Sequence, residues 1–438
     1  VQWTRLPGAL PTPQFVEQIK RLLEAPRKAT PGTLSTNLPP APSSPAAHSS
    51  GFPKWITAAL GAAFLALAAY VVLRPSGNDM ASASKPVAES KPGSAAAPAP
   101  APVAITSTLP ASDKSIAVLP FENRSEDKSN AYFTDGIQED LLTTLAHIAE
   151  LRVVSRTSVM EYRGTTKKMP EIGRELNVAW LLEGSVQRAG NMVHITGQLI
   201  NAKTDEHRWA RSYDRELTAT NIFAIQAELA QAIAAELETA ISPEEKKLLG
   251  RRPTENLAAY DLFLKGRDTR NRYPIPARPE LKEVEQYFKG AVDLDPNFAL
   301  AWAELANVHA LYMQANFDHS PARLGQADAA MAQAVRLAPD APDVIRLIGA
   351  YAYSGHRDYP RATAQFEKII RLEPNNANAF HYLGRVRASQ GRWVESLANH
   401  RKAVELDPGN ALYARYLSGS LIHARRWEEA LTVQRRVG

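Results

Sequence analysis

The chain has 438 residues, of which 45% are hydrophobic, and a formal net charge of +5. This length allows two or three domains with buried cores, and the modest positive charge gives no argument for a nucleic-acid partner. The sequence contains no cysteine, which excludes disulfide bonds, cysteine-ligated zinc and thiol catalysis. Because the chain opens on Val1 and stops inside a repeat pattern at Gly438, we expect it to be a fragment of a longer protein.

Residues 1–26 are predicted to be the end of an upstream domain. VQWTRLPG is typical of a strand that ends in a Pro-Gly turn, and FVEQIKRLL follows with apolar residues at helical spacing. These two motifs resemble the closing strand and helix of TIR domains in bacterial TIR–membrane–tetratricopeptide proteins. TIR domains either cleave NAD or act as scaffolds. The resemblance implies that residues for NAD cleavage would lie upstream of Val1, so we assign no activity to this segment.

Residues 54–74 are predicted to hold a transmembrane helix. The run WITAALGAAFLALAAYVVL at residues 55–73 contains no charge, follows Lys54 and precedes Arg74. At a rise of ~1.5 Å per residue this run covers about 28 Å, which is one hydrocarbon core. Trp55 and Tyr70 suit the two water–lipid interfaces. A buried core helix is the alternative interpretation, but the low-complexity flanks offer such a helix nothing to pack against.

Residues 27–53 and 75–113 are predicted to be linkers, because both are rich in proline and alanine. More cations lie before the apolar run than after it: Arg5, Lys20, Arg21, Arg27, Lys28 and Lys54 against Arg74, Lys85 and Lys91. The positive-inside rule therefore places the amino end in the cytoplasm. We expect a single-pass protein of a bacterial inner membrane, with the later domains in the periplasm.

Residues 114–245 are predicted to form a mixed α/β domain. The expected order is strand 115–121, helix 137–148, strand 151–156, a short helix from Pro170, strands 180–186, 192–200 and 207–213, and helix 221–241. Ala189-Gly190-Asn191 is expected to make the first hairpin turn. Gly184 and Gly197 fall within strands, where we expect close packing or a bulge.

The same domain carries a family resemblance. SIAVLPFENRS, AYFTDGIQEDLLTTL, RVVSRTSVMEYRG and IGRELNVAWLLEGSVQRAGNMVHITGQLI resemble the TolB-amino-terminal-like domain along its whole length. In bacteria this domain recurs between a membrane helix and tetratricopeptide repeats, behind winged helices, kinases, nucleotide cyclases or TIR domains. The resemblance implies a fold and a signalling context, but no ligand or activity, because the family has no agreed one.

Two acidic clusters were considered as chemical sites, and we interpret both as structural. Asp135, Glu139 and Asp140 are expected at the start of a helix, where carboxylates favour the helix dipole. Asp205-Glu206-His207 is expected in a turn, and no second cluster is placed to complete a metal site. The sequence has no glycine-rich phosphate loop, nucleophile elbow or zinc-helix motif. We therefore predict no catalytic residue, no metal and no cofactor in this chain.

Residues 255–438 are predicted to form tetratricopeptide repeats. AVDLDPN, AVRLAPD, IIRLEPN and AVELDPG carry prolines at positions 296, 339, 374 and 408, which gives spacings of 43, 35 and 34 residues. Two of these match the tetratricopeptide period of 34, and the first is expected to carry an insertion near residues 315–323. Large and small residues alternate in each unit, as in Leu383-Gly384, and the unit from Ala411 is expected to continue beyond Gly438.

Such repeats stack into a solenoid whose first helices line a groove for extended or helical peptides. The predicted groove-facing residues are Asn307, Arg346, Tyr353, His381, Arg385 and Arg415. Three of them are arginines, which favour acidic segments or carboxyl termini. A solvated arginine on a helix face is the alternative interpretation at each position.

The predicted fold is therefore a single transmembrane helix, a TolB-amino-terminal-like α/β domain and an all-α tetratricopeptide solenoid. The first functional hypothesis is a membrane-anchored signalling or scaffold protein that binds protein and is not itself an enzyme. The second is the regulatory portion of a TIR-domain NAD-cleaving enzyme whose catalytic residues lie upstream. In a third, the repeats form an assembly scaffold inside the cytoplasm. The sequence does not indicate the oligomeric state.

Overall fold

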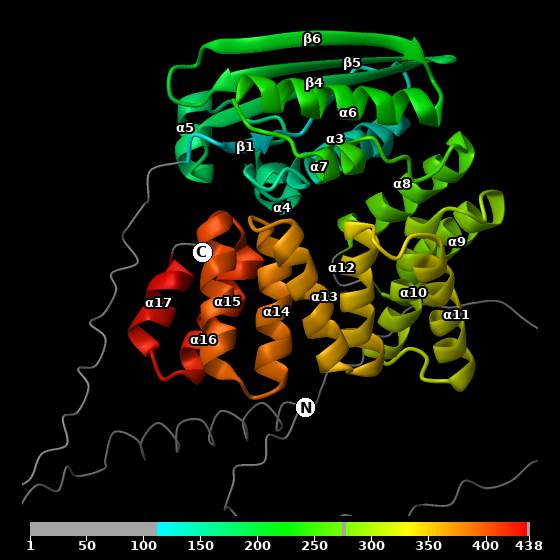
Figure 1. Cartoon of the computed structure of the whole chain (residues 1–438), viewed down its shortest axis with the longest axis vertical. Helices are drawn as coiled ribbons and strands as arrows, with labels where there is room; N and C mark the ends of the chain where they lie inside the picture. Colours follow the sequence, from blue (N-terminus) through cyan, green and yellow to red (C-terminus); the bar gives the residue numbers. More distant parts are fainter. Residues whose placement is uncertain (1–111, 274–276, 436–438) are drawn as a thin grey trace, which may run out of the picture. The chain divides into compact units, whose positions relative to one another are not determined.

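The computed structural model describes residues 112–273 and 277–435 (Figure 1). The predicted end of an upstream domain, the predicted transmembrane helix and nearly all of both predicted linkers lie outside the described residues. No described helix is both long and apolar enough to cross a membrane. The described residues belong to one compact unit that spans residues 99–438.

The first part of this unit is a mixed α/β domain. Its elements are β1 (Ser115–Val118), β2 (Glu122–Asn123), α3 (Ala131–Ala146), β3 (Arg152–Val153), α4 (Arg156–Val159), α5 (Met169–Leu176), β4 (Trp180–Ala189), β5 (Met192–Asn201), β6 (His207–Glu216), α6 (Ala219–Glu236) and α7 (Pro243–Leu249). The sheet has the order β3-β1-β4-β5-β6, and β2 pairs with β4. The first three of these strands are parallel, and β4, β5 and β6 are antiparallel.

The expected order of strands and helices is confirmed, with three additions and one correction; the first addition is the short helix α7 after α6. The structure also adds the short strand β2 and the short helix α4, which begins at Arg156 where a strand was expected to end. Helix α3 begins at Ala131, six residues before the predicted start at Ile137. The acidic residues Asp135 and Asp140 therefore lie within this helix and not at its cap.

The glycines in the sheet allow the close packing that was expected of them. Gly184 pairs with Gly197 across β4 and β5. A Cβ atom on Gly184 would lie 2.5 Å from the carbonyl oxygen of Thr196 and 2.7 Å from the ring of Phe121. Gly190 occupies the predicted hairpin turn with a φ of +59°, which suits a two-residue connection.

The second part is an all-α region of paired helices. Its helices are α8 (Leu257–Arg272), α9 (Arg278–Leu294), α10 (Ala299–Gln314), α11 (Pro321–Leu337), α12 (Pro342–Tyr351), α13 (Tyr359–Leu372), α14 (Ala377–Ser389), α15 (Trp393–Leu406), α16 (Ala411–His423) and α17 (Trp427–Arg435). Helices α9, α11, α13 and α15 each end two residues before a proline, as the repeat pattern predicts. The region is a tetratricopeptide-like solenoid.

Local sequence accounts for the ends and the spacing of these helices. Asn256, Asn376 and Asn410 cap α8, α14 and α16 by accepting hydrogen bonds from backbone amides of the first turn. The predicted insertion is shared between the loop from Gln314 to Pro321, which is longer than the loop between α14 and α15, and the helices α10 and α11, which are longer than α14 and α15. The glycine in α14 allows close pairing, because a Cβ atom on Gly384 would lie 2.6 Å from the ring of His400.

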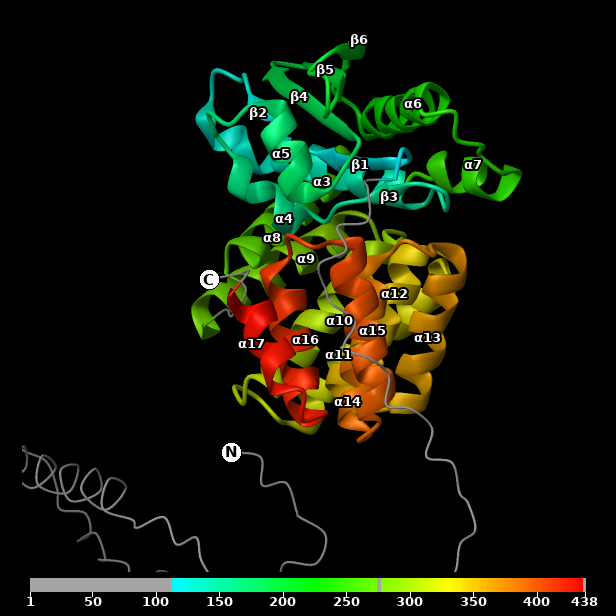
Figure 2. The same cartoon turned by 90° about the vertical axis from the view of Figure 1, so that its left-hand side faces the viewer.

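The α/β domain packs along the edge of the solenoid where the proline loops lie, as Figures 1 and 2 show. The Asn375 amide donates to the carbonyl oxygen of Ala149 at 2.9 Å, and the Ser158 hydroxyl donates to Asp407 at 2.8 Å. One continuous hydrophobic core extends from Ile116 in the sheet to Tyr351 in α12. The two parts are therefore packed as one body.

Candidate functional site

The first candidate site is a cluster of arginine and tyrosine side chains on the first helices of successive repeats. The guanidinium carbon of Arg385 lies 5.0 Å from the ring centroid of Tyr353, 5.2 Å from that of Tyr382 and 5.3 Å from that of Tyr416. All four side chains are half-buried. Such cation–π contacts orient a guanidinium and contribute about 0.5–2 kcal/mol each. We call these four residues the arginine–tyrosine cluster.

The positive charge of this cluster is not neutralised within the described residues. Arg387 on the same helix, by contrast, forms an ion pair with Glu367 at 2.8 Å. Among the described residues, no carboxylate lies within 4.0 Å of Arg346, Arg385 or Arg415. The Nε atom of Arg385 is buried and has no hydrogen-bond partner there. These guanidinium groups are therefore available to an external acceptor.

The other predicted groove residues occupy different environments. Asn307 donates from its amide to the carbonyl oxygens of Ala303 and Leu347, which links α10 to α12. His381 is only 1% exposed and packs between its neighbours in the solenoid core. Burial, helped by the charge of Arg385, lowers the pKa of His381 to about 2, so its imidazole is neutral. It packs in the solenoid core beside the arginine–tyrosine cluster and exposes almost no surface to a peptide.

Of the predicted groove residues, the structure brings Tyr353, Arg385 and Arg415 together. Arg346 lies outside this cluster. Arg415 is exposed, and its guanidinium carbon lies 5.8 Å from the ring centroid of Tyr416. Tyr382 and Tyr416 were missed from the sequence. They stand one repeat period apart, 34 residues, so the periodicity that identified the repeats would have identified them as well.

The acidic pair Glu139-Asp140 has a role that the sequence did not predict. Asp140 accepts a 2.5 Å hydrogen bond from Arg267 on α8 and another from the hydroxyl of Tyr260. Asn271 donates to Glu139 at 2.9 Å. The predicted position at the start of the helix is wrong, because α3 begins at Ala131. The pair instead joins the α/β domain to the solenoid.

Asp205 and Glu206 lie in the connection between β5 and β6, as expected, whereas His207 is the first residue of β6. Asp205 lies between β5 and β6 with a φ of 63°, which is the left-handed conformation common in turns. Within residues 112–273 and 277–435, no group of histidine, aspartate and glutamate side chains is arranged to hold a metal ion.

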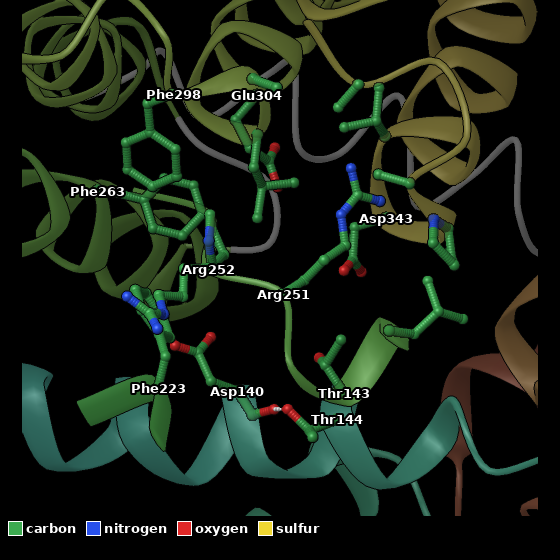
Figure 3. A pocket seen from close by; sticks show the side chains of 18 of the residues that line it. Asp140, Thr143, Thr144, Phe223, Arg251, Arg252, Phe263, Phe298, Glu304 and Asp343 are labelled. Carbon is green, nitrogen blue, oxygen red and sulfur yellow. Dashed lines mark hydrogen bonds between the residues drawn. The ribbon is translucent and has the colours of Figure 1, made fainter. Parts of the chain in front are cut away.

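The second candidate site is a cavity of about 250 Å³ between the α/β domain and the solenoid, which we call the junction cavity (Figure 3). Its walls come from α3, α6, α8, α10, α12 and the segment after α7. A second cavity of about 240 Å³ shares several of these lining residues, including Thr143, His147 and Arg346.

Most charges in the wall of the junction cavity are paired, either across the two domains or within the solenoid. Arg267 pairs with Asp140, and Arg270 pairs with Glu304. His147 lies 2.7 Å from the carboxylate of Glu373. Burial acts to lower the pKa of His147, but the hydrogen bond and charge of Glu373 outweigh it, so the pKa lies above its ordinary value.

Comparisons with known proteins agree with this architecture in part. Residues 112–232 match the family model described as HilA/YgeH-like transcriptional regulator, second domain. The chain is 36% identical over 192 residues to the protein named "Putative adenylate cyclase 3" of Rhizobium meliloti (strain 1021), which is 44% of this chain and 32% of that protein. The chain therefore spans about a third of the length of the curated relative that it matches.

Three solved structures show limited similarity. The pilF protein of Pseudomonas aeruginosa is 18% identical with a TM-score of 0.34, over 41% of this chain and 77% of that one. MamA from Desulfovibrio magneticus RS-1 is 19% identical with a TM-score of 0.29, over 40% and 93%. The LpoB C-terminal domain from Salmonella enterica is 21% identical with a TM-score of 0.21, over 24% and 84%.

Proposed function

We propose that this chain is the partner-binding part of a membrane-anchored bacterial signalling protein, and that its solenoid binds an acidic segment of another protein. The observation that carries the proposal is Arg385, whose guanidinium is held among three tyrosine rings with no carboxylate within 4.0 Å in the described residues. Solenoid repeats present extended surfaces that bind protein segments.

The chemistry of the cluster favours a carboxylate ligand. A guanidinium offers a planar fork of donors that matches a carboxylate in two parallel hydrogen bonds. Contacts with Tyr353 and Tyr416 hold the Arg385 guanidinium in place, so less side-chain entropy is lost when a partner binds. Arg415 adds a second, exposed cation beside the same tyrosine. An acidic segment fits this arrangement better than a basic or apolar one.

The comparisons support a regulatory role. The family model that matches the α/β domain is described as part of a transcriptional regulator, and the curated relative is named a putative adenylate cyclase. These descriptions refer to two different activities, transcriptional regulation and adenylate cyclase activity. We infer that the α/β domain and the solenoid serve regulation, and that the output belongs to another part of the full protein. The TIR-like segment at residues 1–26 is our candidate for the end of such an output domain.

The membrane part of the proposal rests on residues 54–74 and on the excess of cations before them. We place the amino end in the cytoplasm and the α/β domain and solenoid in the periplasm. Topology reporters test this directly when they are fused after residue 438, so that the compact unit stays whole. We expect activity from a periplasm-active reporter and none from a cytoplasm-active one. The reverse result would make the solenoid an intracellular scaffold.

We propose further that these 438 residues carry no catalytic activity of their own. The competing hypothesis is that they regulate an NAD-cleaving enzyme whose catalytic residues lie upstream. The purified chain is therefore expected to leave NAD intact. The same assay on a longer chain that includes the upstream domain separates a regulated NAD-cleaving enzyme from a scaffold.

Binding of a labelled acidic peptide tests the groove proposal. The probe is a fluorescein-labelled oligoglutamate, and the readout is fluorescence anisotropy with the 438-residue chain. We expect saturable binding that weakens about tenfold in R385A, the loss of one charge-assisted contact. The matched control is R392A, which removes an exposed arginine that already pairs with Glu395. Equal weakening in both variants would show general charge attraction and would contradict the proposal.

A further inference from the structure

We propose that the junction cavity binds a small anionic molecule with an apolar body. This inference goes beyond the binding of a protein partner, because it concerns a different set of residues and does not depend on the arginine–tyrosine cluster. It is carried by the composition of the cavity wall, which has an apolar side and a side with unneutralised cations.

The apolar side is formed by packed aromatic rings. Phe263 of α8 and Phe298, just before α10, have ring centroids 4.9 Å apart. Phe223 of α6 stands edge-on to Tyr260 at 4.9 Å. Figure 3 shows the labelled Phe223, Phe263 and Phe298 on one side of the cavity. Because each ring is fixed by its neighbours, this wall offers a preformed surface for a compact apolar group.

The cationic side contains two arginines without an acidic partner. Arg251 extends from the segment after α7, and Arg346 projects from α12; both line the cavity. In the part of the chain that the structure describes, no carboxylate lies within 4.0 Å of either guanidinium. Arg251 nevertheless lies close enough to His147 for its charge to act on the pKa of that imidazole. The two guanidinium groups therefore leave positive charge at the cavity.

The carboxylates in the same wall do not compensate for these two cations. Asp140 is engaged by Arg267 and Glu304 by Arg270. Glu139 faces Arg156 at 3.4 Å and Arg267 at 3.5 Å. Asp343 lies 3.8 Å from His147. Arg252, the remaining arginine of the wall, faces Glu255 at 3.8 Å. These pairs leave Arg251 and Arg346 as the groups able to hold an anion.

The size of the cavity limits the class of ligand. At about 250 Å³ it lies just below the range of roughly 300–1,000 Å³ that is typical of small-molecule sites. This space suits a small carboxylate or phosphate monoester and excludes a dinucleotide. Because the wall comes from both the α/β domain and the solenoid, such a ligand would stabilise their packing. Binding of a small molecule in the cavity would therefore favour the packed arrangement of the α/β domain and the solenoid.

Isothermal titration of the purified 438-residue chain with phenyl phosphate tests the proposal. We expect saturable binding at one site, at least tenfold weaker in R251Q and in R346Q. The control is K282Q, which removes an exposed cation from α9 and should bind like the unmodified chain. A further variant, T143L, fills the cavity without changing its charge and should also abolish binding. Thermal unfolding of each variant without ligand confirms that it is folded.

Two further probes separate the apolar and the anionic contributions. Benzyl alcohol, which lacks the anion, and inorganic phosphate, which lacks the ring, should each bind at least tenfold more weakly than phenyl phosphate. The proposal is overturned by the absence of saturable binding up to 5 mM phenyl phosphate, a concentration far above that of a specific site. It is also overturned if the folded R251Q, R346Q and T143L variants bind as tightly as the unmodified chain.

Discussion

Arg267 on α8 donates a 2.5 Å hydrogen bond to the carboxylate of Asp140 on α3, and thereby joins the solenoid to the α/β domain. Arg267 is 7% exposed. It also donates to the carbonyl oxygen of Gly136 at 3.0 Å. The ion pair therefore lies inside the junction, where a charge is tolerated only with its partners.

Replacement of Asp140 by alanine should destabilise the chain strongly. The variant removes the closest partner of the buried guanidinium of Arg267 and leaves only the carboxylate of Glu139, at 3.5 Å, so the loss should approach the roughly 3–5 kcal/mol of a broken buried pair. Urea unfolding followed by circular dichroism measures the loss. The control D293A breaks the exposed pair between Lys289 and Asp293 on α9, and should cost no more than about 0.5 kcal/mol. Similar losses in the two variants would mean that the junction pair contributes little.

Two glycine substitutions should have opposite effects on stability. A Cβ atom on Gly184 would lie 2.5 Å from the backbone oxygen of Thr196, so G184A should destabilise the chain by about 1–3 kcal/mol. Gly325 lies within α11 with nothing within 4 Å of its Cβ position. G325A should therefore stabilise the chain by up to about 1 kcal/mol. Thermal unfolding shows whether each variant is more or less stable than the unmodified chain. Destabilisation by G325A would contradict the position of Gly325 in α11 with no neighbouring atoms at its Cβ position.

The contact between His147 and Glu373 should make the stability of the junction depend on pH. The groups that act on His147 are Glu373, Asp343 and Arg251, and the net effect raises its pKa. Since the folded pKa is higher than the unfolded one, the stabilisation is fully present below about pH 6.5. It is lost as the pH rises through the folded-state pKa.

The variant H147Q isolates this effect. The difference in unfolding free energy between the unmodified chain and H147Q should be largest at pH 6 and should shrink towards pH 9. Urea unfolding at several pH values gives this difference, and other titrating groups contribute equally to both chains. A difference that is constant, or that grows as the pH rises, would contradict the assigned direction of the pKa shift.

The sequence predicts those parts of the fold that depend on neighbouring residues. The helix ends before Pro374 and Pro408 follow from the missing amide of proline, and the starts of the next helices follow from the capping residues Asn376 and Asn410. The close packing at Gly184 follows from the missing side chain of a glycine within a strand, which lies opposite Gly197. Each of these features can be predicted from a few residues of the sequence.

The contacts of the junction could not be predicted in this way. His147 and Glu373 are separated by 226 residues, and each alone resembles an ordinary polar residue at the end of a helix. Asp140 was interpreted as a dipole partner because its real partner, Arg267, lies in another domain. The buried position of His381 was missed for a similar reason, since its neighbours come from later helices.

Site-specific photo-crosslinking in living cells most directly tests the central claim that the solenoid binds a protein through the arginine–tyrosine cluster. A photoreactive phenylalanine analogue replaces Ser389, an exposed residue whose hydroxyl lies 3.2 Å from that of Tyr353. The control position is Lys402 on α15, which pairs with Glu405. We expect a crosslinked partner at position 389 only, attached through an acidic segment and lost in R385A. Equal crosslinking at both positions, or crosslinking at 389 that persists in R385A, would contradict the claim.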